Sequence, residues 1–449
     1  MTNDPLDSLF VAPDMAAVFA PSTRLQAMLD VEAALARAEA ACGVIPKAAV
    51  KPIMQACDVA LYDGAALGRA GRQAGNLAIP LVAALTAQVA QAAPKAAAWV
   101  HWGATSQDII DSGLMLQLKV ALALFERDMV QLDTALAGLV RQHRRAVMPG
   151  RTWLQQAVPV SFGLKAAGWL GALRRDRSRL REMAPRLLVL QFGGAAGTLA
   201  SLGADGSKVA EKLAQELGLG LPAMPWHAQR DRVVELGAWA GLLTGNLGKM
   251  ARDIALLMQT EVAEVFEPAA PGKGGSSAMP QKRNPVACAA TLAAATRVPG
   301  LVATLFSAMP QEQERGLGGW QAEWQVLPEL LCLAAGALVL MAETIEGLDV
   351  DTSRMRANLD LTRGLVMAEA VALELGRSLG KAVAHKLVAE ASRRAVAEAR
   401  PLRDVLAELP EAAGLLDAAS LKRLFDPAQY LGATQHFIAA VLRDKPKGR

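Results

Sequence analysis

The chain has few aromatic residues. Phe, Trp and Tyr together make up 4% of its 449 residues, whereas hydrophobic residues make up 52%. Ala and Leu therefore supply most of the apolarity, and this composition favours packed helices over sheets. β-branched alternation is also scarce, so any sheet is expected to be a minor part of the fold. We predict an all-α protein with a large core, part of whose apolar surface is buried against other subunits.

Histidine and cysteine are scarce as well. The five His residues show no metal-ligand spacing, so no metal site is expected. The four Cys residues form no Cys-x-x-Cys pair, which is typical of buried thiols in a cytosolic protein. They are Cys42, Cys57, Cys288 and Cys332. We expect neither a metal nor a cofactor.

No region carries charge of one sign. The 47 basic residues are interspersed with 43 acidic ones, which leaves a net charge of +4 and no basic stripe for nucleic acid. This weakly basic balance is compatible with a polyanionic small substrate. The longest apolar run, Leu330–Ala342, is too short to span a bilayer and fits a buried helix. Met1–Phe10 contains acidic residues and no basic region, so we expect no targeting segment, no membrane partner and a cytoplasmic location.

Helical periodicity dominates the chain. Apolar residues recur at helical spacing over 23–42, and Gly43 and Pro46 end that helix. A polar stretch then precedes a long helix over about 110–145, which either Ser106 or Asp108 is expected to cap. Further helices are predicted over 160–184, 206–217, 231–263, 285–308 and 321–346.

Long helices joined by short connectors indicate an elongated bundle. A boundary is expected near 347–352, and shorter helices follow it. The predicted organisation is an N-terminal helical domain over 1–110, a central long-helix bundle over 111–348 and a small C-terminal helical domain over 349–449.

The most informative segment is 272–285, which reads Gly-Lys-Gly-Gly-Ser-Ser-Ala-Met-Pro-Gln-Lys-Arg-Asn-Pro. Glycines let a backbone close over a ligand and expose N–H groups that bind anions. The hydroxyls of Ser276 and Ser277, beside Lys282 and Arg283, supply a proton carrier and positive charge together. A Walker-type phosphate loop is the rival interpretation, but the sequence has neither its Gly-x4-Gly-Lys-Ser/Thr pattern nor a strand before it.

The stretch His101-Trp-Gly-Ala-Thr-Ser-Gln-Asp108 is a second candidate site. Thr105 and Ser106 offer hydroxyl and backbone donors near a helix N-terminus, which is a natural anion site. An ordinary N-cap is the alternative, and the loop at 272–285 favours substrate binding. His101 is either a satisfied structural histidine or a group that contacts the ligand.

A third candidate, Pro225-Trp-His-Ala-Gln-Arg-Asp-Arg-Val-Val-Glu235, opens a long helix. Arg230 and Arg232 near its start suit carboxylate recognition, because Arg can bind a carboxylate in bidentate fashion. The alternative is a surface face on which these arginines pair with Asp231 and Glu235. His227 either faces the site or is a structural histidine at the helix entry.

The loop resembles the Gly-Ser-Ser-x-Met-Pro-x-Lys-x-Asn signature of the fumarase/aspartase superfamily, whose members make or break a bond β to a carboxylate. By this resemblance Ser276 matches the serine that moves the proton on the carbon next to that carboxylate. Lys282 and Asn284 match residues that hold the carboxylate and stabilise its aci form. Thr105 and Ser106 fall in a stretch that resembles the superfamily's first signature region, where a substrate carboxylate is held.

Residues 151–159 depart from a common superfamily pattern. They read Arg-Thr-Trp-Leu-Gln-Gln-Ala-Val-Pro, where many members read Thr-His-x-Gln-x-Ala-x-Pro. Trp153 replaces a general acid or base, and an indole cannot exchange a proton near neutral pH. Gln155 keeps its position and is expected to hydrogen-bond the substrate. The Thr-Trp-Leu-Gln variant resembles the bacterial carboxymuconate cycloisomerases of the superfamily.

The resemblance covers nearly the whole chain. Gln311-Glu-Gln-Glu-Arg315 resembles the Glu-Arg region of the adenylosuccinate lyase branch, so Arg315 either contacts substrate or simply pairs with Glu314. The resemblance implies a three-domain fold and a homotetramer whose active sites collect residues from three chains. The implied reaction is the lactonisation of 3-carboxy-cis,cis-muconate to 4-carboxymuconolactone, with Ser276, Lys282 and His101 as catalytic candidates. An adenylosuccinate lyase, activity on a sulfonated muconate and a catalytically silent, crystallin-like assembly protein remain alternatives.

Overall fold

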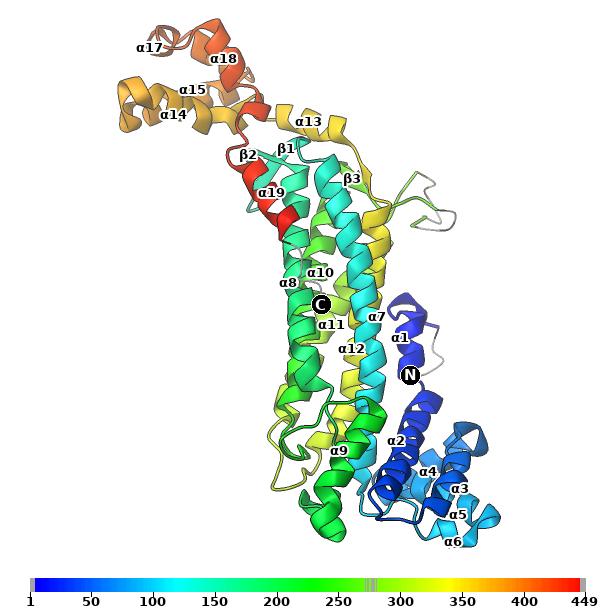
Figure 1. Ribbon diagram of the computed structural model, residues 1–449. Coiled ribbons are helices and arrows are strands. Elements are labelled where there is room, and N and C mark those ends of the chain that lie inside the picture. The colour runs from blue at the N-terminus through cyan, green and yellow to red at the C-terminus, as the bar shows by residue number, and fades with distance from the viewer. Residues whose placement is uncertain (1–4, 271, 273, 276–278, 280, 445–449) are drawn as a thin grey trace. The chain divides into compact units, whose positions relative to one another are not determined.

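The computed structural model describes residues 5–270, 272, 274–275, 279 and 281–444 (Figure 1). It is 71% helical, and the strands of the described residues form two antiparallel pairs. The all-α class predicted from the composition is therefore confirmed.

The chain divides into two compact units, each built from three stretches of sequence. Unit 1 comprises Met1–Met129, Asp176–Gly248 and Ala290–Leu340, and unit 2 comprises Val130–Arg175, Lys249–Ala289 and Met341–Arg449. The long helices that contribute residues to both units are α7 (Ser106–Gln142), α8 (Phe162–Leu187), α10 (Asp231–Leu257), α11 (Val286–Ala308) and α12 (Gly319–Glu346). The three domains drawn from the sequence remain a prediction.

Unit 1 begins with short helices gathered beside α2 (Pro21–Ala41), as Figure 1 shows. The apolar face of α2 includes Leu25, Met28 and Leu35, all buried, and α2 packs against α3 and α9. Gly43 follows the helix at φ 77°, a conformation that glycine adopts without strain. The other helices that lie wholly in this unit are α1 (Pro13–Val18), α3 (Lys47–Ala56), α4 (Gly64–Ala74), α5 (Ala78–Ala92), α6 (Pro94–Ala97) and α9 (Gly206–Leu217).

Glycines allow the long helices of unit 1 to pack closely. A Cβ on Gly237 of α10 would lie 2.4 Å from Cδ1 of Leu305 on α11. A Cβ on Gly336 of α12 would lie 1.8 Å from the carbonyl oxygen of Phe10. The backbone at Phe10 cannot give way, so position 336 requires glycine, whereas at position 237 a larger residue would have to displace the end of the Leu305 side chain.

The long helices follow the predicted ranges closely. Helix α7 begins at Ser106, and α10 ends at Leu257 rather than near residue 263. The chain turns after α10 because the amide of Ala263 donates to the carbonyl of Gln259, with Ala263 at φ 50°. The apolar pattern continues past Leu257, but these residues form a turn that leads into a strand.

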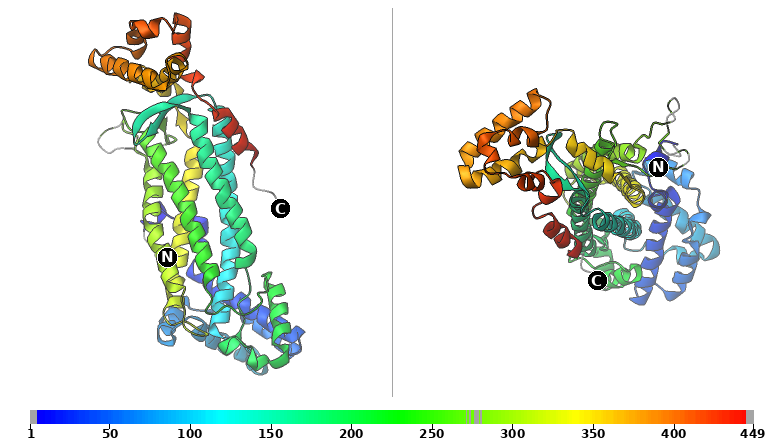
Figure 2. Two further views of the ribbon diagram at one scale, coloured as in Figure 1. Left: turned by 90° about the vertical axis from the view of Figure 1, so that its left-hand side faces the viewer. Right: turned by 90° about the horizontal axis from the view of Figure 1, so that it is seen from above.

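Unit 2 contains the strands. β1 (Val147–Thr152) pairs with β2 (Gln155–Ser161) in a hairpin that closes at Thr152↔Gln155, and β3 (Val265–Phe266) pairs with β4 (Asp349–Val350). The helices after β4 lie in this unit as well, and five of them, between residues 368 and 424, share a separate apolar core that includes Val371, Leu375, Val388 and Leu402. Figure 2 shows most of them in orange and red. The helices after β4 are α13 (Thr352–Asp360), α14 (Ala368–Leu379), α15 (Lys381–Ala397), α16 (Leu402–Ala407), α17 (Pro410–Ala413), α18 (Ala418–Leu424) and α19 (Thr434–Arg443).

Helices α11 and α12 contain longer apolar segments than we expected from the sequence. By length and composition alone, α11 and α12 are long enough to cross a membrane, which corrects the expectation that no run is long enough. The most apolar stretch of α12 is 72% buried within the chain, as in a core helix of a globular protein, whereas that of α11 is 28% buried. The apolar surface of α11 is therefore mostly uncovered by its own chain.

Candidate active site

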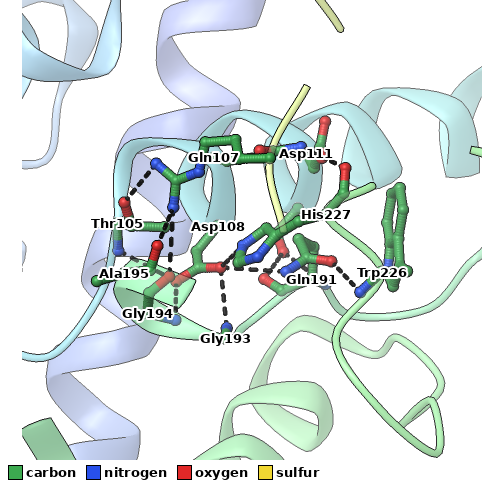
Figure 3. Close-up of polar contacts among 12 residues, drawn as sticks. Thr105, Gln107, Asp108, Asp111, Gln191, Gly193, Gly194, Ala195, Trp226 and His227 are labelled. Atoms are coloured by element: carbon green, nitrogen blue, oxygen red, sulfur yellow. Dashed lines mark hydrogen bonds and ion pairs between the residues drawn. The ribbon is translucent and has the colours of Figure 1, made fainter. Parts of the chain in front are cut away.

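Asp108 lies in the first turn of α7 and joins three loops of unit 1 (Figure 3). The side chain is buried, and its carboxylate is satisfied entirely by neutral or histidine donors. These donors are the backbone amides of Thr105, Gly193 and Gly194, the side-chain amide of Gln191 and Nε2 of His227. The bond from the Thr105 amide, at 3.1 Å, also caps α7. Thr105 is the N-cap residue, and Asp108, the third residue of the helix, accepts from its amide.

Arg315 lies against the turn that Asp108 holds. Its Nη1 donates to Oγ1 of Thr105 at 3.1 Å, and its Nη2 donates to the carbonyl of Ala195 at 2.8 Å. Within the described part of the chain, no carboxylate forms an ion pair with Arg315. The motifs of Thr105 and Arg315, 210 residues apart in the sequence, thus meet at the N-terminus of α7. They place the Arg315 guanidinium there without a carboxylate partner among the described residues. This arrangement suits a bound anion.

His101 belongs to the same turn and is paired with Glu32 of α2. Nδ1 of His101 lies 2.6 Å from Oε1 of Glu32, which is buried. Burial opposes the charged imidazole, but the charge and hydrogen bond of Glu32 outweigh it, so the pKa of His101 lies above its ordinary value. The backbone of His101 has φ 59°, a strained conformation for a non-glycine residue, and such strain is common at functional sites. Glu32 therefore favours the protonated imidazole of His101, and a catalytic role for this residue stays a prediction.

Arg230 lies inside unit 1 rather than on a free face. The side chain is fully buried and donates to Asp111 at 2.7 Å and to Glu323 at 2.6 Å. Burial opposes its charge, but the two carboxylates outweigh it and raise the pKa of Arg230. The Trp226 ring covers the guanidinium at 4.8 Å, and Trp320 Nε1 donates to Asp111. The guanidinium predicted to bind substrate is thus occupied by protein carboxylates.

Arg232 and His227 also have partners within the protein. Nε of Arg232 donates to the carbonyl of Arg186 at 2.9 Å, so this guanidinium anchors the end of α8. His227 is buried, with Nε2 2.8 Å from Asp108 and its carbonyl bound by Gln107. Both residues support the framework around Asp108, and direct contacts with substrate stay a prediction.

The 272–285 loop belongs to unit 2, and Lys273, Ser276 and Ser277 lie outside the described residues. The described end of the loop is anchored: the amide of Asn284 donates to the carbonyl of Gly274 at 2.8 Å. Arg283 donates to the carbonyl of Glu267 at 2.7 Å and stacks on Phe266. Lys282 is exposed. The local structure therefore fixes the basic end of the loop and leaves the Lys282 ammonium at the surface of the chain.

The β1–β2 hairpin presents an apolar tip. Trp153 is 97% exposed and Leu154 is 74% exposed, and both have positive φ, at 52° and 64°. Behind the tip, Arg151 forms a bidentate ion pair with Glu264 at 2.7 and 2.9 Å. Gln155 begins β2 and is exposed. A rigidly anchored hairpin thus displays Trp153, Leu154 and Gln155 to the surroundings of the chain.

The predicted site residues fall into two groups. Unit 1 joins Thr105 to Arg315 directly and Thr105 to His227 through Asp108. It also holds His101, Ser106, Arg230 and Arg232, and the partners of His101, Arg230 and Arg232 are protein groups. Unit 2 holds Gln155, Lys282 and Asn284. No group of three or more His, Cys, Asp or Glu side chains that could hold a metal ion occurs within the described ranges.

Sequence reasoning missed the acidic partners in unit 1. Glu32, Asp111 and Glu323 are all buried, and each pairs with a residue chosen from a motif. A signal was present, because these carboxylates interrupt apolar helical faces where a charge is costly unless it is paired. The pattern did not show which cation each would meet.

The chain matches known families and solved structures over most of its length. A family model described as "Lyase" matches residues 10–300, and one described as "Adenylosuccinate lyase C-terminus" matches residues 364–441. The chain is 57% identical to the 3-carboxy-cis,cis-muconate cycloisomerase of Pseudomonas aeruginosa over 442 residues, which cover 98% of this chain and 96% of that one. It is 54% identical to the enzyme of the same name from Pseudomonas putida, over 94% of this chain and all of that one.

A solved structure is also similar. The 3-carboxy-cis,cis-muconate lactonizing enzyme from Pseudomonas putida has a TM-score of 0.94 and 52% sequence identity, with 98% of each chain covered. The family match spans more than half of the chain, and the relatives match it almost from end to end. The chain therefore belongs to the lyase family of the fumarase/aspartase superfamily.

Proposed function

We propose that this protein is a 3-carboxy-cis,cis-muconate cycloisomerase that forms 4-carboxymuconolactone. The observation that carries the proposal is the full-length match, at 57% identity, to a curated enzyme of that name. The geometry supports it, because Arg315, which has no ion-pair partner among the described residues, lies at the N-terminus of α7 and is available to a carboxylate substrate. Cytoplasmic action within protocatechuate degradation is part of the proposal.

The reaction needs few groups from the protein. One substrate carboxylate oxygen forms a bond to a carbon of the diene, and the electron pair of that double bond moves toward another carboxylate. A protein acid then protonates the adjacent carbon, so the substrate trianion and one added proton give the lactone dianion. Because the nucleophile is already within the molecule, the enzyme mainly selects a conformer and stabilises charge.

The proposed roles follow the superfamily match and the local geometry. Thr105, Ser106 and Arg315 hold one carboxylate, while Lys282 and Asn284 stabilise the carboxylate that takes up charge. Ser276 is the first candidate for the proton donor, and His101 is the second because Glu32 keeps it protonated. Gln155 hydrogen-bonds the substrate.

A homotetramer with shared active sites completes the proposal. The exposed apolar surface of α11 and the exposed hairpin tip at Trp153 support it, because both need cover from other copies of the chain. The proposed site then combines groups of unit 1 from one copy with groups of unit 2 from others.

The test is an incubation of purified protein with 3-carboxy-cis,cis-muconate, with loss of the diene absorbance as the readout. Ser276→Ala is expected to lower kcat by ~10²–10⁴-fold if Ser276 is the acid. His101→Asn is the parallel variant, and the larger loss identifies the donor. Adenylosuccinate is the control substrate, since part of the chain matches an adenylosuccinate lyase model. Turnover of adenylosuccinate alone would end the cycloisomerase proposal, and inactivity on both compounds would favour a silent assembly protein.

A further inference from the structure

Arg24 of α2 is a partly buried cation that lacks an anion. Its Nη2 donates to the carbonyl of Trp324 at 3.4 Å, which is a long hydrogen bond. Within the described part of the chain, no carboxylate lies in ion-pair range of Arg24. Burial lowers the pKa of Arg24. A guanidinium withdrawn from water in this way is costly unless an anion joins it.

A second donor beside Arg24 is also unfilled. Nε1 of Trp324 is buried and has no hydrogen-bond partner among the described residues. The neighbouring Trp320, whose ring is 4.8 Å from that of Trp324, does have a partner, because its Nε1 donates to Asp111 at 3.0 Å. Buried indole N–H groups normally find an acceptor, so the empty position at Trp324 indicates a place for one.

Both donors line two adjoining cavities of unit 1. The smaller has a volume of about 60 Å³ and apolar walls that include Met28, Ile110 and Leu114. The larger, about 540 Å³, shares Arg24, Trp324 and Pro328 with it and is lined elsewhere by more polar groups. The smaller cavity has room for roughly four to six water-sized groups. Apolar walls with a few convergent polar groups are typical of small-ligand sites.

Among the described residues, four carboxylates line these cavities, and three of them are paired with other arginines; the fourth, Asp7 of the larger cavity, forms no ion pair with Arg24. Asp111 and Glu323 line the smaller cavity, but both are bound to Arg230. Glu329 lines the larger cavity and is paired with Arg297. Arg24 therefore keeps a positive charge that these carboxylates do not use.

We propose that Arg24 and Trp324 form a binding site for a short-chain monocarboxylate. The carboxylate accepts from the guanidinium fork of Arg24 and from Nε1 of Trp324, and the alkyl tail of two or three carbons enters the smaller cavity. Arg provides planar, bidentate recognition of a carboxylate, and the indole supplies a single fixed donor. The lining of the smaller cavity includes none of the residues proposed above to bind the muconate.

The test uses trifluoroacetate as a fluorine NMR probe with the full-length protein, and propionate as the competitor. We expect saturable binding that propionate reverses. Arg24→Met, which keeps the length of the side chain, should weaken binding at least ~10-fold, as the loss of a charge-assisted hydrogen bond predicts. Trp324→Phe should weaken it less. Arg403→Met is the matched control, because Arg403 is a surface arginine with its own partner, Asp404, and it should bind as the unaltered protein does.

Several outcomes would overturn the proposal. Equal binding by the unaltered protein and Arg24→Met would do so, and so would the absence of saturable binding at millimolar probe. Loss of binding in Arg315→Met but not in Arg24→Met would place the probe at the Thr105 turn. If Arg24→Met does not fold, Arg24→Lys replaces it, and unchanged affinity there would exclude the bidentate contact. A crystal structure in propionate that shows a protein carboxylate on Arg24 would also refute the site.

Discussion

Two buried glutamates on α2 differ in whether their carboxylates have a hydrogen-bond partner. Glu32 is paired with His101, whereas both carboxylate oxygens of Glu39 are buried without a hydrogen-bond partner among the described residues. Burial, together with the charge of Glu32, raises the pKa of Glu39 to about 9. Glu39 is therefore a neutral acid at neutral pH.

This neutral acid makes stability depend on pH. Between its ordinary pKa of 4.5 and its folded pKa of about 9, the folded state binds one proton more than the unfolded state. Stability must then fall as pH rises through that window, by up to ~1.4 kcal/mol per pH unit. We predict that Glu39→Gln flattens the decline in Tm between pH 5 and pH 9. Glu211→Gln, at an exposed position of α9, is the control. Parallel curves for Glu39→Gln and the unaltered protein would contradict the prediction.

The arginines of unit 1 differ in what they hold. Arg230 neutralises Asp111 and Glu323 inside the protein, whereas Arg315 contacts a hydroxyl and backbone carbonyls. Arg230→Met should lower the free energy of unfolding by ~3–5 kcal/mol, because it leaves two carboxylates buried without their cation.

Arg315→Met provides the matched comparison. It should leave Tm nearly unchanged and raise KM for the muconate by ~10–100-fold, as the loss of a charged hydrogen bond predicts. Thermal denaturation and steady-state kinetics on both variants separate the two roles. A stable Arg230→Met protein with a raised KM would restore Arg230 as a substrate ligand.

The residues of the site were predictable from sequence to different degrees. Thr105 and Arg315 were chosen from separate motifs, and the structure joins them. Arg230 was chosen because an arginine at a helix start suits a carboxylate, and the structure does give it carboxylates, but these belong to the protein. The residue type carries the preference for an anion. The identity of that anion depends on the packing of α7, α10 and α12, which local sequence does not encode.

At the scale of elements, periodicity predicted the helices well and missed the β1–β2 hairpin. The long helices bury apolar faces along many turns, so their pattern is strong. The hairpin contains Pro149 and Gly150 within β1, and both residues are typical of turns. A bulge in the register between Pro149 and Arg151 accommodates them. The pair is therefore typical of a turn by residue type but lies inside a strand.

The tip of this hairpin has residues that do not suit its backbone. Two-residue turns with positive φ at both positions favour Asn-Gly, whereas this turn has Trp153-Leu154. Such strain costs ~1–3 kcal/mol per residue and persists where function requires it. We predict that replacing the pair by Asn-Gly, Trp153→Asn with Leu154→Gly, lowers kcat/KM at least ~10-fold while helix content is unchanged. Circular dichroism and the muconate assay test this.

A single Leu154→Gly variant is the control for relief of strain alone. It should keep most of the activity, because Trp153 and Gln155 remain in place. If the double variant were more stable and equally active, the tip would have no part in the proposed site.

At the scale of the whole molecule, the apolar surface of α11 is typical of an interface with another subunit. Phe306 on this helix is 52% exposed, and the helix as a whole is poorly covered by its own chain. Single exposed apolar residues are common on soluble proteins, but a long helix that is apolar and uncovered marks an interface. The proposed tetramer places this surface in a core shared by four copies.

Phe306→Glu tests this arrangement, because it would bury a charge in that shared core without a partner. We expect light scattering to show dissociation of the tetramer and the muconate assay to show loss of activity, since each proposed site needs more than one chain. Phe437→Glu is the matched control: Phe437 on α19 is 55% exposed, and its replacement should leave both the mass and the activity unchanged. A Phe306→Glu tetramer with full activity would remove α11 from the interface. A monomer of this variant with full activity would show instead that one chain suffices, and the shared site would have to be abandoned.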